Sequence, residues 1–311
     1  MRRQRKNIVQ ITSTFILPAG AVAALCGWAV SGQIKVDVQV VNVLCTVYDG
    51  RGALVKDLDK DAFEIREDGR PQQIRYFARE TDLPLTLALL LDVSGSVRKF
   101  LQSEKDTAVQ FLRAVIRPQD QAMITGFSST VVVWRDFTPS IALLGDALQA
   151  MHAVPFKGLP KDGGPMPTTL LYDALSSTAM NKMANVPGRK AMVIISDGVD
   201  IGSRTNLEFA VRETQTANAI VYSICYPNGH QPGCGYLKSL SEPTGGRMFE
   251  LGTKTSLDAI FRTIEAELRS QYSLGFVSDN QARDGSFRKL QVRVNTKGMR
   301  VVSRKGYYVE K

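Results

Sequence analysis

The chain has 311 residues, of which 44% are hydrophobic and 22% charged, and its formal net charge is +9. These values are typical of a globular protein of two or three domains, and they exclude a mostly disordered, collagenous or polytopic membrane chain. Four of the 39 basic residues lie within residues 1–31, so part of the excess charge belongs to the N-terminus. No basic stretch is interleaved with aromatic residues, which argues against nucleic-acid binding.

The N-terminal segment has the pattern of a targeting signal. Residues 1–7 are basic, and residues 8–30 carry no charge. Ala29 and Ser31 are the small residues that signal peptidase requires before a cleavage site. We therefore expect residues 1–31 to be a signal peptide, with an uncleaved membrane anchor as the alternative because the apolar run approaches the ~20 residues that span a bilayer. Both interpretations predict export to the periplasm, the cell surface or the medium, with membrane contact only through this segment.

The cysteines also bear on the compartment. Cys225 and Cys234 flank a turn-rich loop that can close on itself as a disulfide, a bond that exported proteins retain; unpaired thiols are the alternative. Cys45 alternates with apolar neighbours, which indicates a buried thiol. His152 and His230 have no metal-ligand spacing to the cysteines, so a structural zinc site is not expected.

Residues 34–80 alternate between apolar and polar residues, as β-strands do. A long strand is predicted over residues 34–49. It is followed by a hairpin whose turn is Asp68-Gly69. This segment is too small to bury a substantial core by itself.

Between residues 84 and 270, apolar runs of strand length alternate with segments of helical periodicity. Strands are predicted at 85–92, 121–127, 130–137, 190–196 and 219–226, and helices at 97–116, 170–183, 205–218 and 256–270. A continuous apolar strand such as 85–92 is covered on both faces. The alternation of strands and helices therefore predicts an α/β fold with a doubly wound, mainly parallel sheet.

Residues 271–311 return to alternation, with turns at Asp284-Gly285 and Lys297-Gly298. Neither β segment is long enough to be stable alone, whereas together they can form two small sheets packed face to face. We therefore predict a small β-sandwich built from residues 32–81 and 271–311, flanking an α/β domain at 82–270.

Acids and hydroxyls follow two of the predicted strands. Asp92, Ser94 and Ser96 come directly after one strand, and Asp197 after another; Thr168-Thr169 opens a helix between them in the chain. Ligands of open α/β sheets bind outside the carboxyl ends of the strands. Carboxylates and hydroxyls are hard ligands that suit Mg²⁺, Mn²⁺ or Ca²⁺, with water or a partner's oxygen completing the shell.

These residues match a known pattern. DVSGS at 92–96 resembles the D-x-S-x-S motif of von Willebrand factor type A domains, and TLLYDAL at 169–175 resembles their T-x-L-Y-D-A junction, which favours Thr169 over Thr168. The SDG sequence at 196–198 resembles the last element. The resemblance covers about residues 84–270. The flanks, including DAFEIREDG and SFRKLQVRV, resemble exported bacterial proteins called VWFA-related, known especially from acidobacteria.

The resemblance implies a metal-ion-dependent adhesion site, or MIDAS, with Mg²⁺ as the first expectation and Mn²⁺ or Ca²⁺ as alternatives. Ser94, Ser96 and Thr169 would be direct ligands, whereas Asp92 and Asp197 would act mainly through metal-bound waters. The ion would then capture a Glu or Asp carboxylate of a protein partner. Loops 157–167 and 228–236 would select that partner.

Other interpretations explain the same residues less completely. Ser94 and Ser96 could only cap a helix, and Asp173 and Asp200 are expected to be capping or solvated residues. Trp134, Tyr307 and Tyr308 are expected to be packing residues.

An enzyme is not expected. A haloacid-dehalogenase-like phosphatase needs an Asp where Ser94 stands, and neither histidine accompanies a nucleophile elbow. No phosphate-binding or dinucleotide fingerprint is present. The sequence thus predicts an exported adhesion or protein-binding module. A scaffold protein of the cell envelope with a non-essential metal site is the main alternative, and a metal-dependent hydrolase the remaining one.

Overall fold

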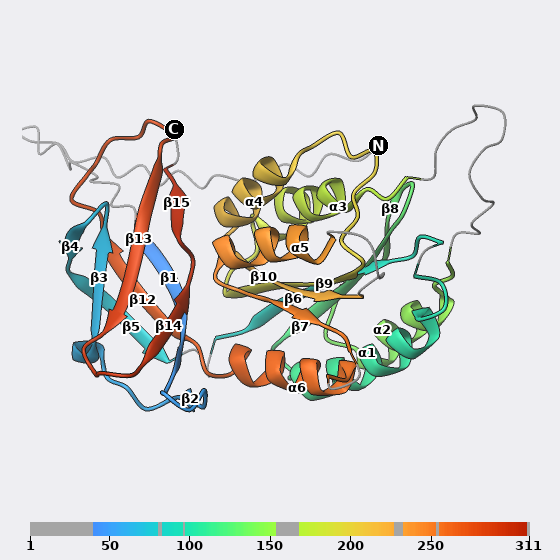
Figure 1. Ribbon diagram of the computed structural model, residues 1–311, viewed down its shortest axis with the longest axis horizontal. Helices are drawn as coiled ribbons and strands as arrows, with labels where there is room; N and C mark the ends of the chain where they lie inside the picture. The colour runs from blue at the N-terminus through green and yellow to red at the C-terminus, as the bar shows by residue number, and fades with distance from the viewer. Residues whose placement is uncertain are drawn as a thin grey trace, which may run out of the picture. The chain divides into compact units, whose positions relative to one another are not determined.

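The computed structural model describes residues 40–79, 83–95, 97–153, 168–226, 233–252 and 255–309. These residues belong to one compact unit, which contains a six-stranded sheet between helices and two smaller antiparallel sheets (Figure 1). The predicted leader at residues 1–31 lies outside the described residues. Within the described part, no helix is both long and apolar enough to cross a membrane.

The large sheet has the strand order β11-β10-β9-β6-β7-β8. Its strands are β6 (Leu85–Asp92), β7 (Gln121–Phe127), β8 (Val131–Thr138), β9 (Arg189–Ser196), β10 (Ala219–Cys225) and β11 (Met248–Glu250). All neighbours pair in parallel except β7 with β8. This arrangement confirms the predicted doubly wound, mainly parallel sheet. The chain order reverses between β6 and β9, which is where such sheets form a crevice for ligands.

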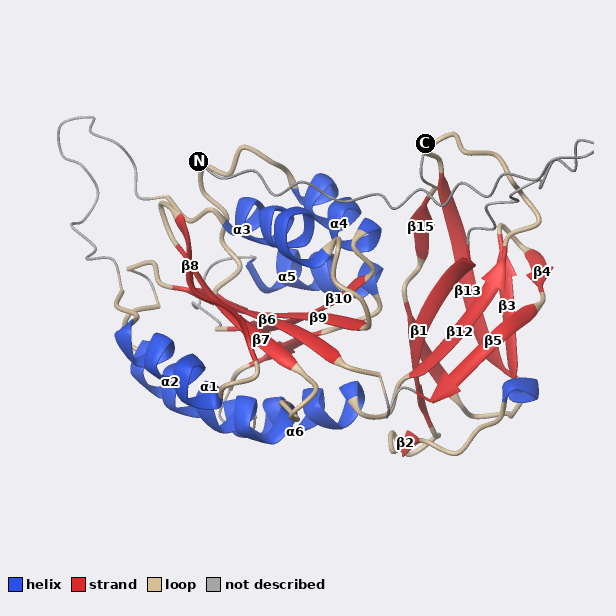
Figure 2. Cartoon of the chain, turned by 180° about the vertical axis from the view of Figure 1, so that it is seen from behind, coloured by secondary structure: helices blue, strands red, loops and turns tan. Residues whose placement is uncertain are grey.

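In the part of the chain that the structure describes, six α-helices cover the two faces of this sheet. They are α1 (Leu101–Val115), α2 (Ile141–Ala150), α3 (Leu171–Thr178), α4 (Leu207–Thr216), α5 (Gly233–Ser241) and α6 (Leu257–Leu268), with short helical turns at Lys60–Ala62, Ala179–Met183 and Glu242–Thr244. Helices α1, α2 and α6 lie on one face and α3, α4 and α5 on the other (Figure 2). Alternate residues of β6 enter opposite cores: Leu89 packs with the first group and Leu90 with the second. Burial on both faces explains why this strand is a continuous apolar run.

The helices differ from the sequence analysis at three places. Helix α1 begins at Leu101, not at residue 97, so Ser94 precedes it by several residues and is not its N-cap, which is Phe100. Helix α2 was not predicted; Ser140 caps it by accepting a hydrogen bond from the Leu143 amide. Helix α5 begins at Gly233, inside a segment predicted to be a loop.

The two smaller sheets combine strands from both ends of the described chain. One contains β1 (Val40–Tyr48), β2 (Leu54–Val55), β5 (Ile74–Arg79), β12 (Tyr272–Val277) and β14 (Arg300–Ser303); the other contains β3 (Phe63–Glu67), β4 (Arg70–Gln72), β13 (Phe287–Val294) and β15 (Gly306–Tyr308). Their orders are β14-β1-β12-β5, with β2 beside β1, and β15-β13-β3-β4. Buried residues of both sheets, among them Val43, Ile65 and Phe276, form one hydrophobic cluster.

Turn chemistry sets the local register of these sheets. Asp68 and Gly69 have φ values of 47° and 83°, the left-handed conformation that a two-residue hairpin between β3 and β4 requires. The alternation of residues 299–309 alone would predict one strand. In the structure they divide into β14 and β15, which belong to different sheets, and Arg304-Lys305 connects them.

The domain boundaries at residues 81 and 270 stay a prediction with a simple test. We expect residues 34–80, expressed alone, to be unfolded or aggregated, because β1 pairs with β12 and β3 with β13. Strand edges without these partners are prone to aggregation. We expect residues 82–270 to give a folded domain. Circular dichroism and size-exclusion chromatography of both fragments would measure this, and a stable monomer of residues 34–80 would contradict it.

Candidate functional site

The site is built on two adjacent parallel strands. Asp92 is the last residue of β6, and Ser196 is the last residue of β9, with Asp197 directly after it. The register pairs Leu91 with Ile195, so Asp92 and Ser196 leave the sheet side by side. Both aspartates are buried, with 0% of Asp92 and 6% of Asp197 exposed.

Hydrogen bonds from both strand ends hold the Asp92 carboxylate. Its Oδ1 accepts from the Ser94 amide at 2.8 Å, and its Oδ2 accepts from the Ser196 hydroxyl at 2.7 Å. The Ser196 oxygen in turn accepts from the Gly198 amide at 3.0 Å. Asp197 Oδ1 accepts from the Val199 amide at 3.1 Å. The two carboxylates are therefore oriented by the backbone of their own loops.

Electrostatics at this site favour a bound cation. Burial raises the pKa of Asp92 to about 6, hydrogen bonds from Ser94 and Ser196 oppose the rise, and the nearby charge of Asp197 adds to it. Two acids that lie close together in a partly desolvated crevice repel one another. A divalent ion would relieve that repulsion.

The loop that contains Thr169 is tied to both neighbouring loops. Thr169 and Ile201 exchange two backbone hydrogen bonds of 2.9 Å, and the Leu170 amide donates to the Ser128 carbonyl at 2.9 Å. These bonds place Thr169 beside the loop that follows Asp197. Thr169 is 8% exposed. The structure thus brings Asp92, Ser94 and Asp197 together, with the Thr169 loop adjacent. Ser96 lies outside the described residues.

The loop after β9 also abuts the start of α5. A Cβ added at Gly198, whose φ is +78°, would lie 2.1 Å from the Gly233 carbonyl oxygen, and one at Gly233 would lie 1.9 Å from the Asp197 oxygen. Only glycine fits at both positions. A disulfide joins Cys225 to Cys234 and links the end of β10 to this helix, the pairing left open by the sequence. The sequence analysis did not predict helix α5. It also did not predict that the Ser196 hydroxyl donates a hydrogen bond to Asp92.

The donor set fits a hard divalent ion only with help from hydroxyls and water. Within the described residues, no group of three or more His, Cys, Asp or Glu side chains could hold a metal. Asp92 and Asp197 supply carboxylates, and Ser94 and Thr169 supply hydroxyls. All are hard oxygen donors of the kind that Mg²⁺ and Mn²⁺ accept, and such ions commonly retain waters.

Comparison with known proteins concerns the sequence segment and the fold that contain this site. Residues 87–199 match the family model of the von Willebrand factor type A domain. Within these residues, this chain is therefore similar to a von Willebrand factor type A domain. No curated protein matches the chain in sequence.

Comparison with solved structures concerns the fold of the chain. One match is proximal thread matrix protein 1 from the mussel byssus, solved with a zinc-occupied MIDAS motif. It is 14% identical to this chain, with a TM-score of 0.51, and the match covers 66% of this chain and 50% of that one. The vWF domain of the type V pili tip protein Mfa5 from Porphyromonas gingivalis is 14% identical with a TM-score of 0.48, covering 59% of this chain and 94% of that one. At 14% identity, the likeness to proximal thread matrix protein 1 concerns the fold alone.

Two other acids of the type A domain have structural roles. Asp173 accepts hydrogen bonds from the Arg204 and Thr205 amides, and Asp200 accepts one from the Tyr172 amide at the start of α3. Both therefore fix loops around the site: Asp200 acts at the first turn of α3, as expected of a capping residue, whereas Asp173 caps no helix and holds the segment before α4.

Glu104 on α1 is a buried acid that sequence reasoning did not single out. It is 1% exposed and forms no ion pair with a described basic residue. Burial raises the pKa of Glu104 to about 8; the Tyr226 hydroxyl partly offsets this, and the charge of Asp92 adds to it. The folded protein therefore keeps a proton on Glu104 that the unfolded chain, with an ordinary pKa of 4.5, releases.

We expect Glu104→Gln to stabilise the protein, by about 1–3 kcal/mol near pH 8. Because the folded-state pKa is the higher one, the wild type loses stability as pH rises from about 4.5 to about 8, and the variant lacks this slope. Urea denaturation at about pH 5, 7 and 9 would measure the difference. Asp146→Asn, on the exposed side of α2, is the matched control that removes a surface carboxylate. Identical profiles for wild type and E104Q would refute the assignment.

Proposed function

We propose that this protein is an exported protein-binding module that captures a partner carboxylate through a divalent cation at the ends of β6 and β9. One observation carries the proposal. The buried Asp92 carboxylate is oriented by Ser94 and Ser196 at the topological switch point, with the Asp197 carboxylate beside it.

The roles of the individual residues follow from their chemistry. Ser94, Ser96 and Thr169 would bind the ion directly through neutral hydroxyls, whereas Asp92 and Asp197 would act mainly through waters. Neutral direct ligands leave the ion's positive charge largely uncompensated. Mg²⁺ is the first candidate, with Mn²⁺ and Ca²⁺ as alternatives, since all three prefer oxygen.

The partner group that suits such an ion is a carboxylate. A Glu or Asp side chain is hard and anionic, and it can replace a water in an incomplete shell. Residues 157–167 lie outside the described residues, and part of 228–236 is the start of α5 rather than a loop. We propose that the surface around α5 contributes to the choice of partner.

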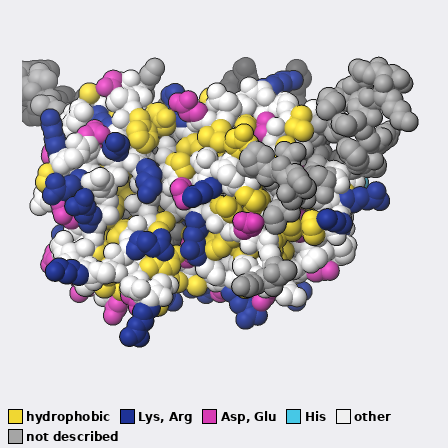
Figure 3. Space-filling model, in the orientation of Figure 1, with side chains coloured by type: hydrophobic (Ala, Val, Ile, Leu, Met, Phe, Trp, Pro, Cys, Tyr) yellow, Lys and Arg dark blue, Asp and Glu magenta, His cyan; other side chains and the backbone are white. Residues whose placement is uncertain are grey.

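Two features support export. The basic and apolar pattern of residues 1–31 is that of a signal peptide or membrane anchor. The Cys225–Cys234 disulfide is of a kind that persists in oxidising compartments. On the face in Figure 3, Lys and Arg side chains are scattered among acidic and uncharged ones, which favours a protein partner over nucleic acid.

Catalysis is not part of the proposal. His152 packs edge-on against Trp134 with ring centroids 5.6 Å apart, and its ring bonds to the Ala150 carbonyl rather than to a nucleophile. An envelope scaffold with a non-essential metal site is the alternative that experiment must separate.

The test is capture of exported proteins by the immobilised full-length chain, with Mg²⁺ and with chelator. We expect capture to be lost with chelator and with Thr169→Ala, and retained with Thr168→Ala, which removes the neighbouring hydroxyl. For a partner so identified, neutralising one particular Glu or Asp should also abolish capture. Equal capture in excess chelator would contradict the proposal, and the scaffold interpretation would then lead.

A further inference from the structure

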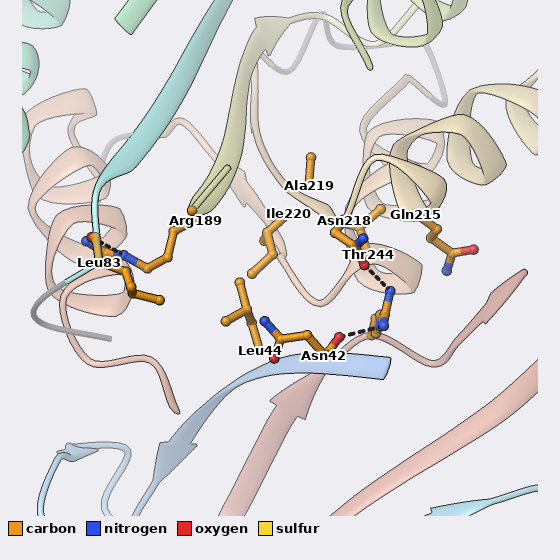
Figure 4. A pocket seen from close by; sticks show the side chains of 11 residues that line it. Asn42, Leu44, Leu83, Arg189, Gln215, Asn218, Ala219, Ile220 and Thr244 are labelled. Carbon is orange, nitrogen blue, oxygen red and sulfur yellow. Dashed lines mark hydrogen bonds between the residues drawn. The ribbon is translucent and has the colours of Figure 1, made fainter. Parts of the chain in front are cut away.

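A cavity of about 220 Å³ lies at the opposite end of the large sheet from the metal site. Its lining includes Arg189 and Ala219, the first residues of β9 and β10, together with Asn42 of β1 (Figure 4). Arg304 also lines it. Strand β9 runs from this cavity to Ser196, so the two sites are about 23 Å apart at ~3.3 Å per residue. The cavity is therefore separate from the proposed adhesion site.

Arg304 gives this cavity an uncompensated positive charge. The residue is 8% exposed, and its guanidinium donates to Asn218 Oδ1 at 2.8 Å and to the Asn42 carbonyl. Both acceptors are neutral, and no described acidic residue forms an ion pair with Arg304. Burial lowers the pKa of Arg304 to about 10, which still leaves the group protonated at neutral pH. A buried cation without an anion is costly to a fold.

The rest of the described lining holds no acid that would cancel that charge. Among the described lining residues, Arg189 is the other ionisable one, and it donates to the carbonyls of Leu83 and Leu268. No Asp or Glu is among the described lining residues. Polar amides and the apolar side chains of Leu44 and Ile220 complete the wall. The cavity is thus positive, partly enclosed and partly apolar.

We propose that this cavity binds a small oxyanion, a carboxylate or a phosphate group, through the guanidinium of Arg304. A guanidinium presents its N–H groups in a planar fork that matches the oxygens of both groups. The volume lies below the ~300–1,000 Å³ of drug-sized ligand pockets, which restricts the ligand to inorganic phosphate or a short organic acid. Bound there, the anion would lie against both β1 and the start of β10.

The experiment compares anions at constant ionic strength. Inorganic phosphate and succinate are titrated into the metal-free full-length chain, with chloride as the reference, and heat and thermal midpoint are recorded. We expect saturable binding of at least one of the two oxyanions and a higher midpoint in its presence. Binding of phosphate but not succinate assigns the phosphate class, and the reverse assigns the carboxylate class.

Asn218→Asp is the decisive variant, because it puts a carboxylate of the same size beside Arg304. Asn218 has a φ of +53°, a conformation that Asp also tolerates, so the loop should be preserved. We expect at least a tenfold loss of anion affinity and a higher midpoint without anion. Arg304→Gln should also lose binding, whereas Asp92→Ala, at the distant metal site, should not. Absence of saturable binding in the wild type, an equal response to chloride, or equal binding by N218D would overturn the proposal.

Discussion

We expect the double variant Asp92→Ala, Ser94→Ala to lose saturable binding of Mg²⁺ and Mn²⁺, whereas the wild type binds one ion with modest affinity. The double variant removes one of two carboxylates and one of the hydroxyls from a site that has no third acid among the described residues. Since loss of even an outer-sphere partner weakens metal binding about 10–100-fold, loss of these two groups should exceed 100-fold. Isothermal titration calorimetry would measure it.

Ser196→Ala provides a graded control for this result. It removes the hydroxyl that donates to Asp92 Oδ2 but leaves every proposed ligand in place. We expect ion affinity to fall about tenfold rather than to vanish. Circular dichroism should show both variants folded, because the site lies at the end of the sheet. Equal affinity of wild type and double variant would show that the ion, if any, binds elsewhere.

The sheet and the candidate site were predictable because their signals are local. Strand β6 is a continuous apolar run that ends in Asp92, and β9 is another that ends in Ser196, so the sequence itself indicates where each strand stops. The rule that parallel strands present their carboxyl ends at one edge then places Asp92 and Asp197 together. Their proximity follows from where the two strands end, and no side-chain detail is needed to predict it.

The features that sequence reasoning missed depend on contacts between distant segments. Helix α5 starts at Gly233, where Asp197 and Gly198 approach too closely for any side chain, and a disulfide holds it. Nothing in the turn-rich sequence before it indicates that contact. Likewise, the change of sheet at Arg304 has no local signal, because β14 and β15 have the alternation of one strand. Tertiary packing determines both the start of α5 and the change of sheet at Arg304.

We expect Arg247→Met to destabilise the protein by about 3 kcal/mol. Arg247 forms an ion pair with Glu267 near the end of α6, and the Glu267 side chain is only 3% exposed. The same guanidinium lies over the rings of Tyr48 and Phe249, at 5.7 and 4.5 Å. Removing one member of a buried pair leaves an uncompensated charge, which costs about 3–5 kcal/mol; the 32% exposure of Arg247 places the effect at the lower end. Urea denaturation at neutral pH would measure it.

The pH dependence identifies the cause of this loss. Burial already raises the pKa of Glu267 above its ordinary value of 4.5, and the charge of Arg247 opposes that rise. Without Arg247 the folded-state pKa rises further, so the folded variant holds a proton that the unfolded chain releases above about pH 4.5. The deficit of R247M should therefore be smallest near that pH and grow as pH rises.

Two further variants separate charge burial from simple loss of packing. Arg262→Met removes an exposed pair with Asp258 on the same helix, with side chains 77% and 49% exposed, and should cost less than about 1 kcal/mol. Adding Glu267→Gln to R247M removes the stranded charge, so the double variant should regain most of the lost stability and lose the pH slope. If R247M and the double variant are equally unstable at every pH, then Arg247 acts through its contacts with the two aromatic rings and not through Glu267.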